Sequence, residues 1–398
     1  MRSLIDKKIV LGVTGSIAVY KAVELLRHLT KGGAKVTVAM TANAAWFVRP
    51  LTFETLSGSP VIQDMFSQPG TSLDHVTLGR ESDLIIIAPA TANFMAKMAH
   101  GLADDFLSTL MLAAACQVLV CPAMDKTMFE NSRVQSNILR LKEQGCIVME
   151  PDEGLLASGA VGAGRLPDPV HILEKAGYLL TDHDLKGIKL LVTAGPTVEY
   201  MDPVRIVTNR STGKMGYALA TAAWRRGAEV TLISGPTYLD PPMGVKTVKI
   251  QTAEEMREAV LHDYHKQDVV IKAAAVSDYK PLKKAREKEK KKTSAITVEM
   301  GPTPDILEEL GRQKGKAVLV GFAAETKNHR ANALNKMEKK NLDMIVVNDV
   351  SQQDRGFAAD SNEVRIIDRK GTEEVIPLMS KEDVADRILE RIKWLKSK

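Results

Sequence analysis

Two series of short apolar runs, separated by stretches with helical spacing, constrain this chain more than any other feature of its sequence. The first series consists of KIVLGV at 8–13, KVTVAM at 35–40, DLIIIAP at 83–89, QVLVCP at 117–122 and CIVME at 146–150. The segment between the first two runs has the apolar spacing of a helix, so the chain is predicted to open with a strand–helix–strand unit. Continuous apolar strands indicate a parallel sheet that is covered on both faces.

The same pattern starts again near residue 188. The second series consists of IKLLVTAGPT at 188–197, EVTLIS at 229–234, DVVIKAAA at 268–275, AVLVGFAAE at 317–325 and DMIVVND at 343–349. We therefore expect an α/β protein with two tandem, doubly wound (Rossmann-like) parallel-sheet domains. The polar segment Tyr178–Gly187 is the predicted boundary, which gives domains at 1–180 and 188–398. A single domain with an elaborated sheet is the less favoured alternative, because 398 residues exceed one comfortable core.

Composition restricts the class of protein. Hydrophobic residues make up 44% of the chain and charged residues 26%, which is typical of soluble globular proteins. No apolar run approaches the roughly 20 residues of a membrane helix, and the N-terminus shows no secretory signal. Three cysteines are too few for a disulfide framework. We expect a cytoplasmic protein without a membrane partner.

The positive charge is concentrated in one segment. KKAREKEKKK, Lys283–Lys292, holds seven basic and two acidic residues, so it accounts for the whole net charge of +5. A nucleic-acid-binding face is usually broad and carries interleaved aromatic residues, and neither feature is present. The sequence therefore argues against a nucleic-acid partner, and steep salt-dependent DNA affinity would be needed to revive that alternative.

Loops at the carboxyl ends of the strands are the expected ligand sites in open α/β sheets. The first loop, GVTGSIA, lacks the G-x-G-x-x-G spacing, and the second strand ends without an acid for a ribose hydroxyl, so NAD is disfavoured. Small and hydroxyl-bearing residues still suit a phosphate at a helix N-terminus; they are Gly15, Ser16, Thr41 and Thr91.

Several of these loops together resemble a known family. GSIAVYK, PATANFMAK followed by GLADD, and PAMDKTMFE resemble flavin-binding cysteine decarboxylases, in particular phosphopantothenoylcysteine decarboxylase. TAGPTVEYMDPVRIVTNRSTGKMG, AAAVSDY and GFAAET resemble phosphopantothenoylcysteine synthetase. The motifs follow in order across nearly the whole chain, so it is similar to the bifunctional coenzyme A biosynthesis family, in which ligase and decarboxylase are fused.

For the second half, the resemblance implies a ligase reaction in two steps. The carboxylate of 4′-phosphopantothenate attacks the α-phosphate of CTP, and the amine of cysteine then displaces CMP from the acyl-cytidylate. Asp278 is implied as the ligand of Mg²⁺ that accompanies the triphosphate, although its spacing alone also fits an ordinary loop aspartate. Asn209 is implied to act on the acyl-cytidylate, and its alternative role is a helix cap.

The basic segment also acquires a role from the resemblance. KEKK at 288–291 matches the K-x-K-K pattern of the family, which implies a mobile loop that closes on phosphates with Lys288 as a transition-state contact. Glu289 replaces the apolar residue usual inside this motif, so the register stays open. Thr303 stands where the family commonly has asparagine. The other implied CTP contacts are Ala273, Ala274, Thr303, Pro304, Asp305, Ile306, Phe322, Lys336 and Lys340.

For the first half, the resemblance implies FMN-dependent oxidation of the thiol side, loss of CO₂ and re-reduction of the enethiolate. His75 is implied as a base, whereas a lone histidine is more often structural, and Asn93 is implied to lie beside flavin and substrate. The implied FMN contacts are Gly15, Ser16, Ile17, Thr41, Pro89, Ala90, Thr91 and Asn93.

Two positions depart from the family pattern. Asp125 stands where an asparagine normally holds the substrate carboxylate; an ionised aspartate would repel it, whereas a protonated one, with a raised pKa, could donate a hydrogen bond. Ser158 stands in place of the flap cysteine that helps to return the enethiolate to the saturated thiol. Its segment, Leu155–Pro169, is expected to be a mobile flap to which Gly162 and Gly164 give backbone freedom.

These departures leave alternatives open. The decarboxylase half is either impaired or stops at the enethiol, or the two residues were introduced to trap a complex. A ligase fused to a purely scaffolding first domain is a further alternative, which a colourless purified protein would favour. The resemblance also implies a homo-oligomer, with trimeric flavin domains and dimeric ligase domains that combine into a dodecamer.

Overall fold

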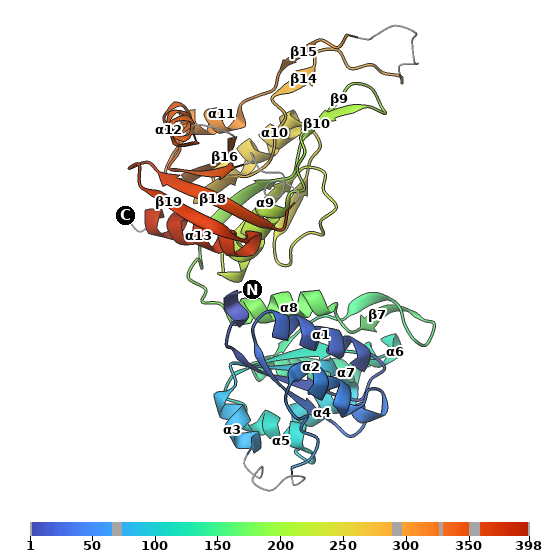
Figure 1. The fold of residues 1–398 in the computed structure, drawn as a ribbon. Helices are drawn as coiled ribbons and strands as arrows, with labels where there is room; N and C mark the ends of the chain where they lie inside the picture. The colour runs from blue at the N-terminus through green and yellow to red at the C-terminus, as the bar shows by residue number, and fades with distance from the viewer. Residues whose placement is uncertain (1, 66–73, 289–296, 326–328, 350–358, 397–398) are drawn as a thin grey trace. The chain divides into compact units, whose positions relative to one another are not determined.

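The chain forms two compact units, Met1–Thr181 and Asp182–Lys398, called here the N-terminal and C-terminal units. A computed structural model describes residues 2–65, 74–288, 297–325, 329–349 and 359–396 (Figure 1). The division falls inside the polar segment Tyr178–Gly187. In the part of the chain that the structure describes, no helix is both long enough and apolar enough for a membrane span.

The N-terminal unit is built on a five-stranded parallel sheet with the order β2-β1-β3-β4-β5. Its strands are β1 (Lys8–Val13), β2 (Lys35–Met40), β3 (Leu84–Ala90), β4 (Gln117–Pro122) and β5 (Ile147–Val148). Strand order reverses beside β1, so the crevice between β1 and β3 is the expected ligand position of this sheet.

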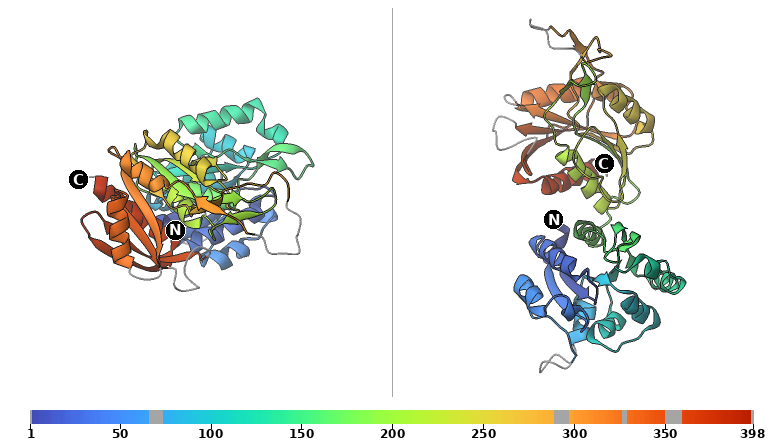
Figure 2. Two further views of the ribbon diagram at one scale, coloured as in Figure 1. Left: turned by 90° about the horizontal axis from the view of Figure 1, so that it is seen from above. Right: turned by 90° about the vertical axis from the view of Figure 1, so that its right-hand side faces the viewer.

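Helices cover both faces of this sheet, as Figure 2 shows. One face packs against α1 (Val19–Lys31), α2 (Pro50–Ser57) and α8 (Pro169–Leu179). The other packs against α4 (Ala92–His100), α5 (Phe106–Ala113) and α7 (Ser132–Glu143). Successive strand residues point to opposite faces, so Ile9 and Leu11 of β1 join the first core and Val10 joins the second. This double burial explains why the strands are continuously apolar.

The remaining elements of the N-terminal unit lie around the sheet. They are the short 3-10 helices η1 (Arg2–Leu4) and η2 (Ala44–Trp46), the helices α3 (Asp74–Glu81) and α6 (Lys126–Phe129), and an antiparallel hairpin of β6 (Asp152–Leu155) and β7 (Val161–Arg165).

The C-terminal unit is built on an eight-stranded sheet with the order β12-β11-β8-β13-β16-β17-β18-β19. The strands are β8 (Lys189–Ala194), β11 (Glu229–Ser234), β12 (Lys246–Lys249), β13 (Val269–Lys272), β16 (Val318–Glu325), β17 (Met344–Asp349), β18 (Ser361–Asp368) and β19 (Glu373–Ser380). The first six in this order are parallel and doubly wound, which confirms the predicted fold class. Three of the eight strands, β12, β18 and β19, are not among the five predicted apolar runs, and β18 and β19 extend the sheet in antiparallel fashion.

Helices also cover both faces of the larger sheet. α9 (Lys214–Arg225) and α13 (Lys381–Lys396) share a core on one face. α10 (Ala253–Tyr264), α11 (Ile306–Arg312) and α12 (His329–Lys339) share a core on the other. Two small antiparallel ribbons complete the unit, β9 (Val198–Tyr200) with β10 (Ile206–Thr208) and β14 (Tyr279–Pro281) with β15 (Met300–Pro302).

Candidate active sites

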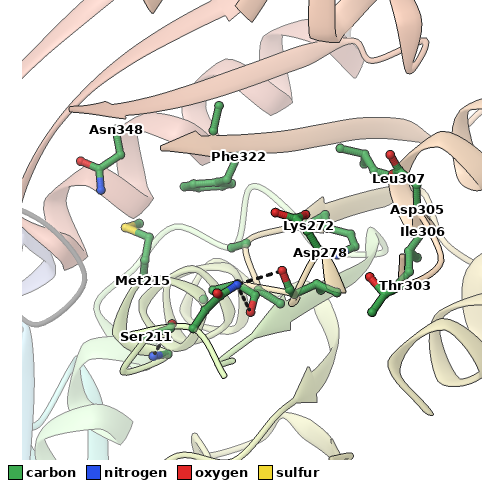
Figure 3. A pocket seen from close by; sticks show the side chains of 18 of the residues that line it. Ser211, Met215, Lys272, Asp278, Thr303, Asp305, Ile306, Leu307, Phe322 and Asn348 are labelled. Carbon is green, nitrogen blue, oxygen red and sulfur yellow. Dashed lines mark hydrogen bonds between the residues drawn. The ribbon is translucent and has the colours of Figure 1, made fainter. Parts of the chain in front are cut away.

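A cavity of about 570 Å³ opens in the C-terminal unit at the carboxyl ends of β13 and β17, beside the start of α9 (Figure 3). Segments that are up to 131 residues apart in the sequence, from Asn209 to Lys340, bring their predicted site residues to this one cavity. The predicted residues that line it are Asn209, Ala273, Ala274, Asp278, Thr303, Pro304, Asp305, Ile306, Phe322, Lys336 and Lys340.

Hydrogen bonds hold the loops of this cavity in place. The side-chain amide of Asn209 donates to the carbonyl oxygens of Ala275 at 3.3 Å and Val276 at 3.0 Å, which Figure 3 marks with dashed lines. Thr303 donates through its hydroxyl to the Ser277 carbonyl at 2.5 Å and through its backbone N–H to the Asp278 carbonyl at 2.9 Å. Three separate loops are thereby fixed relative to one another.

The N-cap of α9 shows whether Asn209 is a helix cap, the alternative role that the sequence left open. The N-cap of this helix is Gly213, with φ +78°, so Asn209 does not cap it. A Cβ at Gly213 would lie 2.7 Å from the Thr237 methyl carbon, which requires glycine at this turn. Asn209 is instead a side chain that ties its own loop to the loop after β13.

Lysines dominate the charge along one side of the cavity. Lys336 Nζ donates to the Phe322 carbonyl at 3.1 Å, and Lys340 pairs with Asp305 at 2.7 Å. Burial opposes ionisation of Asp305, but its hydrogen bond to Lys340 leaves the pKa below the ordinary value. Asp305 also caps α11 by accepting from the Glu308 N–H at 3.1 Å. This side of the cavity is suited to anionic ligands.

Lys272 is a cavity residue that the sequence reasoning missed. It is the last residue of β13 and is only 8% exposed. Burial lowers its pKa to about 7, and the nearby Asp305 opposes this shift. The signal in the sequence was the lysine that ends the apolar strand VVIK, which is easily taken for the ordinary end of a strand.

Further lining residues that the sequence reasoning missed come from the start of α9 and from the C-terminal part of the sheet. They are Lys214, Met215, Asn348, Asn362 and Lys381. Lys288, by contrast, is exposed and is not among the residues that line the cavity. The rest of its motif, residues 289–291, lies outside the described residues, so the role of Lys288 stays a prediction.

In the N-terminal unit, the loops after β1 and β3 are joined directly. Thr14 donates through its hydroxyl to the Pro89 carbonyl at 2.7 Å and accepts from the Thr91 N–H at 3.0 Å. The Ala88–Pro89 peptide bond is cis. Thr91 also caps α4 by accepting from the Phe94 N–H at 3.3 Å. Pro89, Ala90 and Thr91 therefore lie beside the loop that holds Gly15 and Ser16.

Two observations fit a bound phosphate-bearing group at these loops. The buried hydroxyl of Thr41 has no hydrogen-bond partner among the described residues. A Cβ at Gly15 would lie 2.5 Å from Asn43 Cβ, so only glycine allows these two loops to approach this closely. Ile17 and Asn93 are exposed near the starts of α1 and α4. The donor set is compatible with the predicted FMN contacts.

The predicted flap, Leu155–Pro169, contains most of the β6–β7 hairpin, and its glycines have a second role besides the predicted one. Gly164 accepts from the Met124 N–H at 2.9 Å, and a Cβ at Gly164 would lie 2.3 Å from the Met124 carbonyl oxygen. A Cβ at Gly162 would lie 2.5 Å from the Lys126 side chain. The φ angles are +152° and +157°. Such angles use the backbone freedom of glycine, and the missing Cβ also allows close docking of the hairpin on residues 124–126.

The two departures from the family pattern meet where this hairpin contacts the N-cap residue of α6, Asp125. Ser158 Oγ donates to Asp125 Oδ2 at 2.5 Å, and Asp125 Oδ1 accepts from the Thr127 N–H at 2.9 Å and the Thr127 hydroxyl at 2.7 Å. The bond from Ser158, followed by those from Thr127, lowers the pKa of Asp125 to about 2. The possibility of a protonated Asp125 with a raised pKa is therefore wrong, because all these neighbours donate to the ionised form.

His75 is half-buried as the second residue of α3, which packs on α5. Among the described residues, no hydrogen bond joins His75 to the loops after β1, β3 or β4, and its role stays a prediction. Cys116 and Cys146 precede β4 and β5, at the opposite edge of the sheet from these loops. Cys121 lies inside β4, where burial raises the pKa of its thiol.

Family models match both units. A model described as flavoprotein matches residues 2–179, and a model described as DNA/pantothenate metabolism flavoprotein C-terminal domain matches residues 185–395. The Coenzyme A biosynthesis bifunctional protein CoaBC of Bacillus subtilis (strain 168) is 47% identical over 392 residues, covering 97% of each chain. The protein with the same name in Escherichia coli (strain K12) is 43% identical over 396 residues, covering 98% of this chain and 97% of that one.

Solved structures resemble each unit separately. The crystal structure of the C-terminal domain of a Coenzyme A biosynthesis bifunctional protein CoaBC is 43% identical, with a TM-score of 0.47, and covers 54% of this chain and 98% of that chain. The FMN-dependent cysteine decarboxylase SpaF is 33% identical, with a TM-score of 0.39, and covers 44% of this chain and 98% of that chain.

Proposed function

Since this chain belongs to the family of bifunctional coenzyme A biosynthesis proteins, we propose that its C-terminal unit ligates 4′-phosphopantothenate to cysteine with CTP and that its N-terminal unit decarboxylates the product. The observation that carries the ligase assignment is one cavity that gathers the predicted CTP contacts, except Lys288, from four separate segments. The expected product of the two complete reactions is 4′-phosphopantetheine.

The charges of the cavity support the first step of the ligase reaction. A carboxylate and a triphosphate repel each other, so an enzyme that joins them must supply cations in a fixed arrangement. Lys272, Lys336 and Lys340 line the cavity, and one of them is held by Asp305. Attack by the substrate carboxylate on the α-phosphate forms the acyl-cytidylate and releases pyrophosphate, whose charge these lysines would stabilise.

Asp278 is the residue proposed to hold Mg²⁺. Mg²⁺ commonly binds one or two carboxylates together with phosphate oxygens, so one aspartate in a nucleotide cavity fits this ion. Within the described ranges, no three or more His, Cys, Asp or Glu side chains are grouped so that they could hold a metal ion. We therefore propose that Mg²⁺ arrives with CTP and is held by Asp278 and the phosphates.

The loop anchored by Asn209 would act in the second step. Its amide is fixed on the carbonyl oxygens that follow β13, next to Asp278. The amine of cysteine attacks the acyl carbon, CMP leaves with the bonding electron pair, and the amine loses a proton as the amide forms. A fixed side chain at this position would hold the acyl-cytidylate in line for that attack.

The N-terminal unit is proposed to hold FMN at the loops of Gly15, Thr41 and Thr91, where the unpaired Thr41 hydroxyl offers a hydrogen bond. A bound FMN supplies the exchange of electrons with the thiol side of the substrate. His75 would remove a proton from the substrate, and Asn93 would orient it. The docked hairpin would exclude water from this site.

Decarboxylation without complete reduction is a second candidate function for the N-terminal unit. Asp125 is ionised at neutral pH and paired with Ser158, so it repels a substrate carboxylate. Ser158 also lacks the acidity of the thiol that is expected at this position. This pair favours a product mixture in which the enethiol accumulates.

Two parallel incubations test these assignments. Purified, FMN-loaded protein is supplied either with CTP, cysteine and 4′-phosphopantothenate or with preformed phosphopantothenoylcysteine, and the products are followed by mass spectrometry. We expect phosphopantothenoylcysteine and pyrophosphate in the first case and CO₂ loss with slow release of 4′-phosphopantetheine in the second. An absence of ligation would overturn the ligase proposal, and rapid, complete 4′-phosphopantetheine release would overturn the second candidate.

The cellular setting and assembly follow from the same proposal. We propose a cytoplasmic homo-oligomer, with trimeric N-terminal units and dimeric C-terminal units that together give a dodecamer. Light scattering of the purified protein measures this mass directly, and a monomer at assay concentration would contradict it.

A further inference from the structure

One end of the C-terminal cavity is formed by residues to which the sequence analysis gives no role. In Figure 3, Met215 and Asn348 lie on one side of Phe322, whereas Thr303 and Asp305 lie on the other. The antiparallel extension of the sheet supplies Asn362 from β18 and, directly after β19, Lys381 from the start of α13. We call this part of the cavity, with Lys214, the extension end.

Two lysines, Lys214 and Lys381, line the extension end. Lys381 is only 6% exposed, although it lines the cavity. Its backbone N–H donates to the Asp360 carbonyl at 3.0 Å, and Lys214 Nζ lies 2.5 Å from Asp360 Oδ1. Burial lowers the pKa of Lys381 to about 8, Lys214 adds to this effect and Asp360 opposes it. The two ammonium groups therefore lie in each other's field, and an anion bound beside Lys381 would favour its ionised form.

A buried acceptor lies in the same place. Asn362 is only 3% exposed, lines the cavity and has an Oδ1 atom without a hydrogen-bond partner among the described residues. Asn348 Oδ1 is likewise buried and unpaired within the described part of the chain. An unpaired buried acceptor is costly, roughly 1–3 kcal/mol. Such atoms indicate a ligand that brings a hydroxyl or N–H donor close to its anionic group.

We propose that Lys381 and Asn362 form a phosphate subsite, in which Lys381 binds a phosphate of a substrate and Asn362 accepts a hydrogen bond from a neighbouring hydroxyl. This subsite rests on the proposed ligase function. CTP and 4′-phosphopantothenate both carry a phosphate ester near a hydroxyl group, so the required chemistry is shared by these two substrates. Cysteine carries a carboxylate and an ammonium group, and binding of cysteine here is an outcome that the test distinguishes.

Steady-state ligase kinetics with the full chain test the subsite. The variants are Lys381→Met, which removes the charge, Lys381→Arg, which keeps it, and Asn362→Leu, which removes the acceptor. Lys393→Met is the matched control, because Lys393 lies on the same helix but is exposed and pairs with Asp184. The KM of each of the three substrates is measured with the other two at saturation.

Lys381→Met should raise the KM of either CTP or 4′-phosphopantothenate about 10- to 100-fold, as expected for a lost hydrogen bond to a charged group. The substrate whose KM rises identifies the source of the phosphate. Lys381→Arg should recover part of the loss, Asn362→Leu should raise the KM of the same substrate, and Lys393→Met should change nothing. A rise confined to cysteine, or no change in any KM, would overturn the proposal.

Two further measurements separate the possible failures. Calorimetric titration of the protein with inorganic pyrophosphate should show weaker binding in Lys381→Met than in the wild type, without requiring catalysis. If Lys381→Met does not fold, Lys214→Met provides the charge deletion at a more accessible position and should show a smaller rise in the same KM. A wild-type protein that binds pyrophosphate but ligates nothing would contradict the proposed function and not the subsite.

Discussion

Replacement of Lys272 by methionine is expected to stabilise the C-terminal unit at low pH, although it removes a residue of the cavity. Lys272 is 8% exposed, and burial lowers its pKa from 10.5 to about 7. Below pH 7 the lysine is protonated in both the folded and the unfolded state, and the folded state bears the full cost of the buried charge. Between pH 7 and 10.5 the folded state loses the proton first, so the cost declines as pH rises.

The size of the effect follows from the difference between the two pKa values. Each unit of pKa corresponds to about 1.4 kcal/mol, so the protonated lysine lowers the free energy of unfolding by roughly 4–5 kcal/mol at pH 6. At pH 9 the same linkage leaves a cost of roughly 2 kcal/mol. Methionine has a similar length and no charge, so Lys272→Met should be more stable than the wild type by amounts that shrink in this way.

Urea unfolding between pH 6 and 9 measures this difference. A Trp46→Phe background leaves Trp224 and Trp394, both in the C-terminal unit, as the emitting tryptophans, and Trp46 is 88% exposed. Lys272→Arg is the matched control. Arginine keeps its charge, so the free-energy cost of the buried charge should not decline between pH 6 and 9. A stability difference between wild type and Lys272→Met that does not vary with pH would refute the reasoning.

Three further predictions concern the N-terminal unit. Gly164→Ala should destabilise the β6–β7 hairpin by about 1–3 kcal/mol, because the added Cβ meets the Met124 carbonyl. Faster amide hydrogen exchange in β6 and β7 would show this loss of stability. Gly159→Ala is the control and should have the smaller effect, because no atom lies within 4 Å of its Cβ. Ser158→Ala should raise the pKa of Asp125 from about 2 towards its ordinary value in an NMR titration, and an unchanged value would mean that the bond to Ser158 is not its main cause. Alkylation followed by mass spectrometry should label Cys116 and Cys146 slowly and Cys121 hardly at all, since burial raises all three thiol pKa values. Labelling should leave the decarboxylation rate unchanged, and a loss of activity would place a cysteine in the reaction.

The parallel strands were predictable because double burial leaves a direct mark on the sequence. The runs at 35–40 and 229–234 match β2 and β11 to the residue. The strands β18 and β19 were missed because each alternates buried and exposed residues or carries several charges, as in SNEVRIID. A search for continuous apolar runs cannot find strands that are partly exposed on one face.

The candidate site in the C-terminal unit was predictable as far as motifs extended. Asn209, Asp278 and Phe322 belong to recognisable segments, and the structure brings all three to one cavity. Lys272 and Lys381 could not be found in this way, because a lysine at the end of a strand or the start of a helix is usually solvated. Their burial depends on tertiary packing, which short sequence patterns do not record.

The antiparallel extension has a consequence for the order in which this chain becomes functional. Because Asn362 and Lys381 line the same cavity as Asn209, the ribosome must synthesise and release the chain past residue 381 before the cavity can close. α13 packs on α9 in a shared core, so a segment synthesised much later covers a helix that begins at residue 214. A nascent chain that lacks α13 would therefore expose this core, and ligands that need Lys381 would not stabilise it.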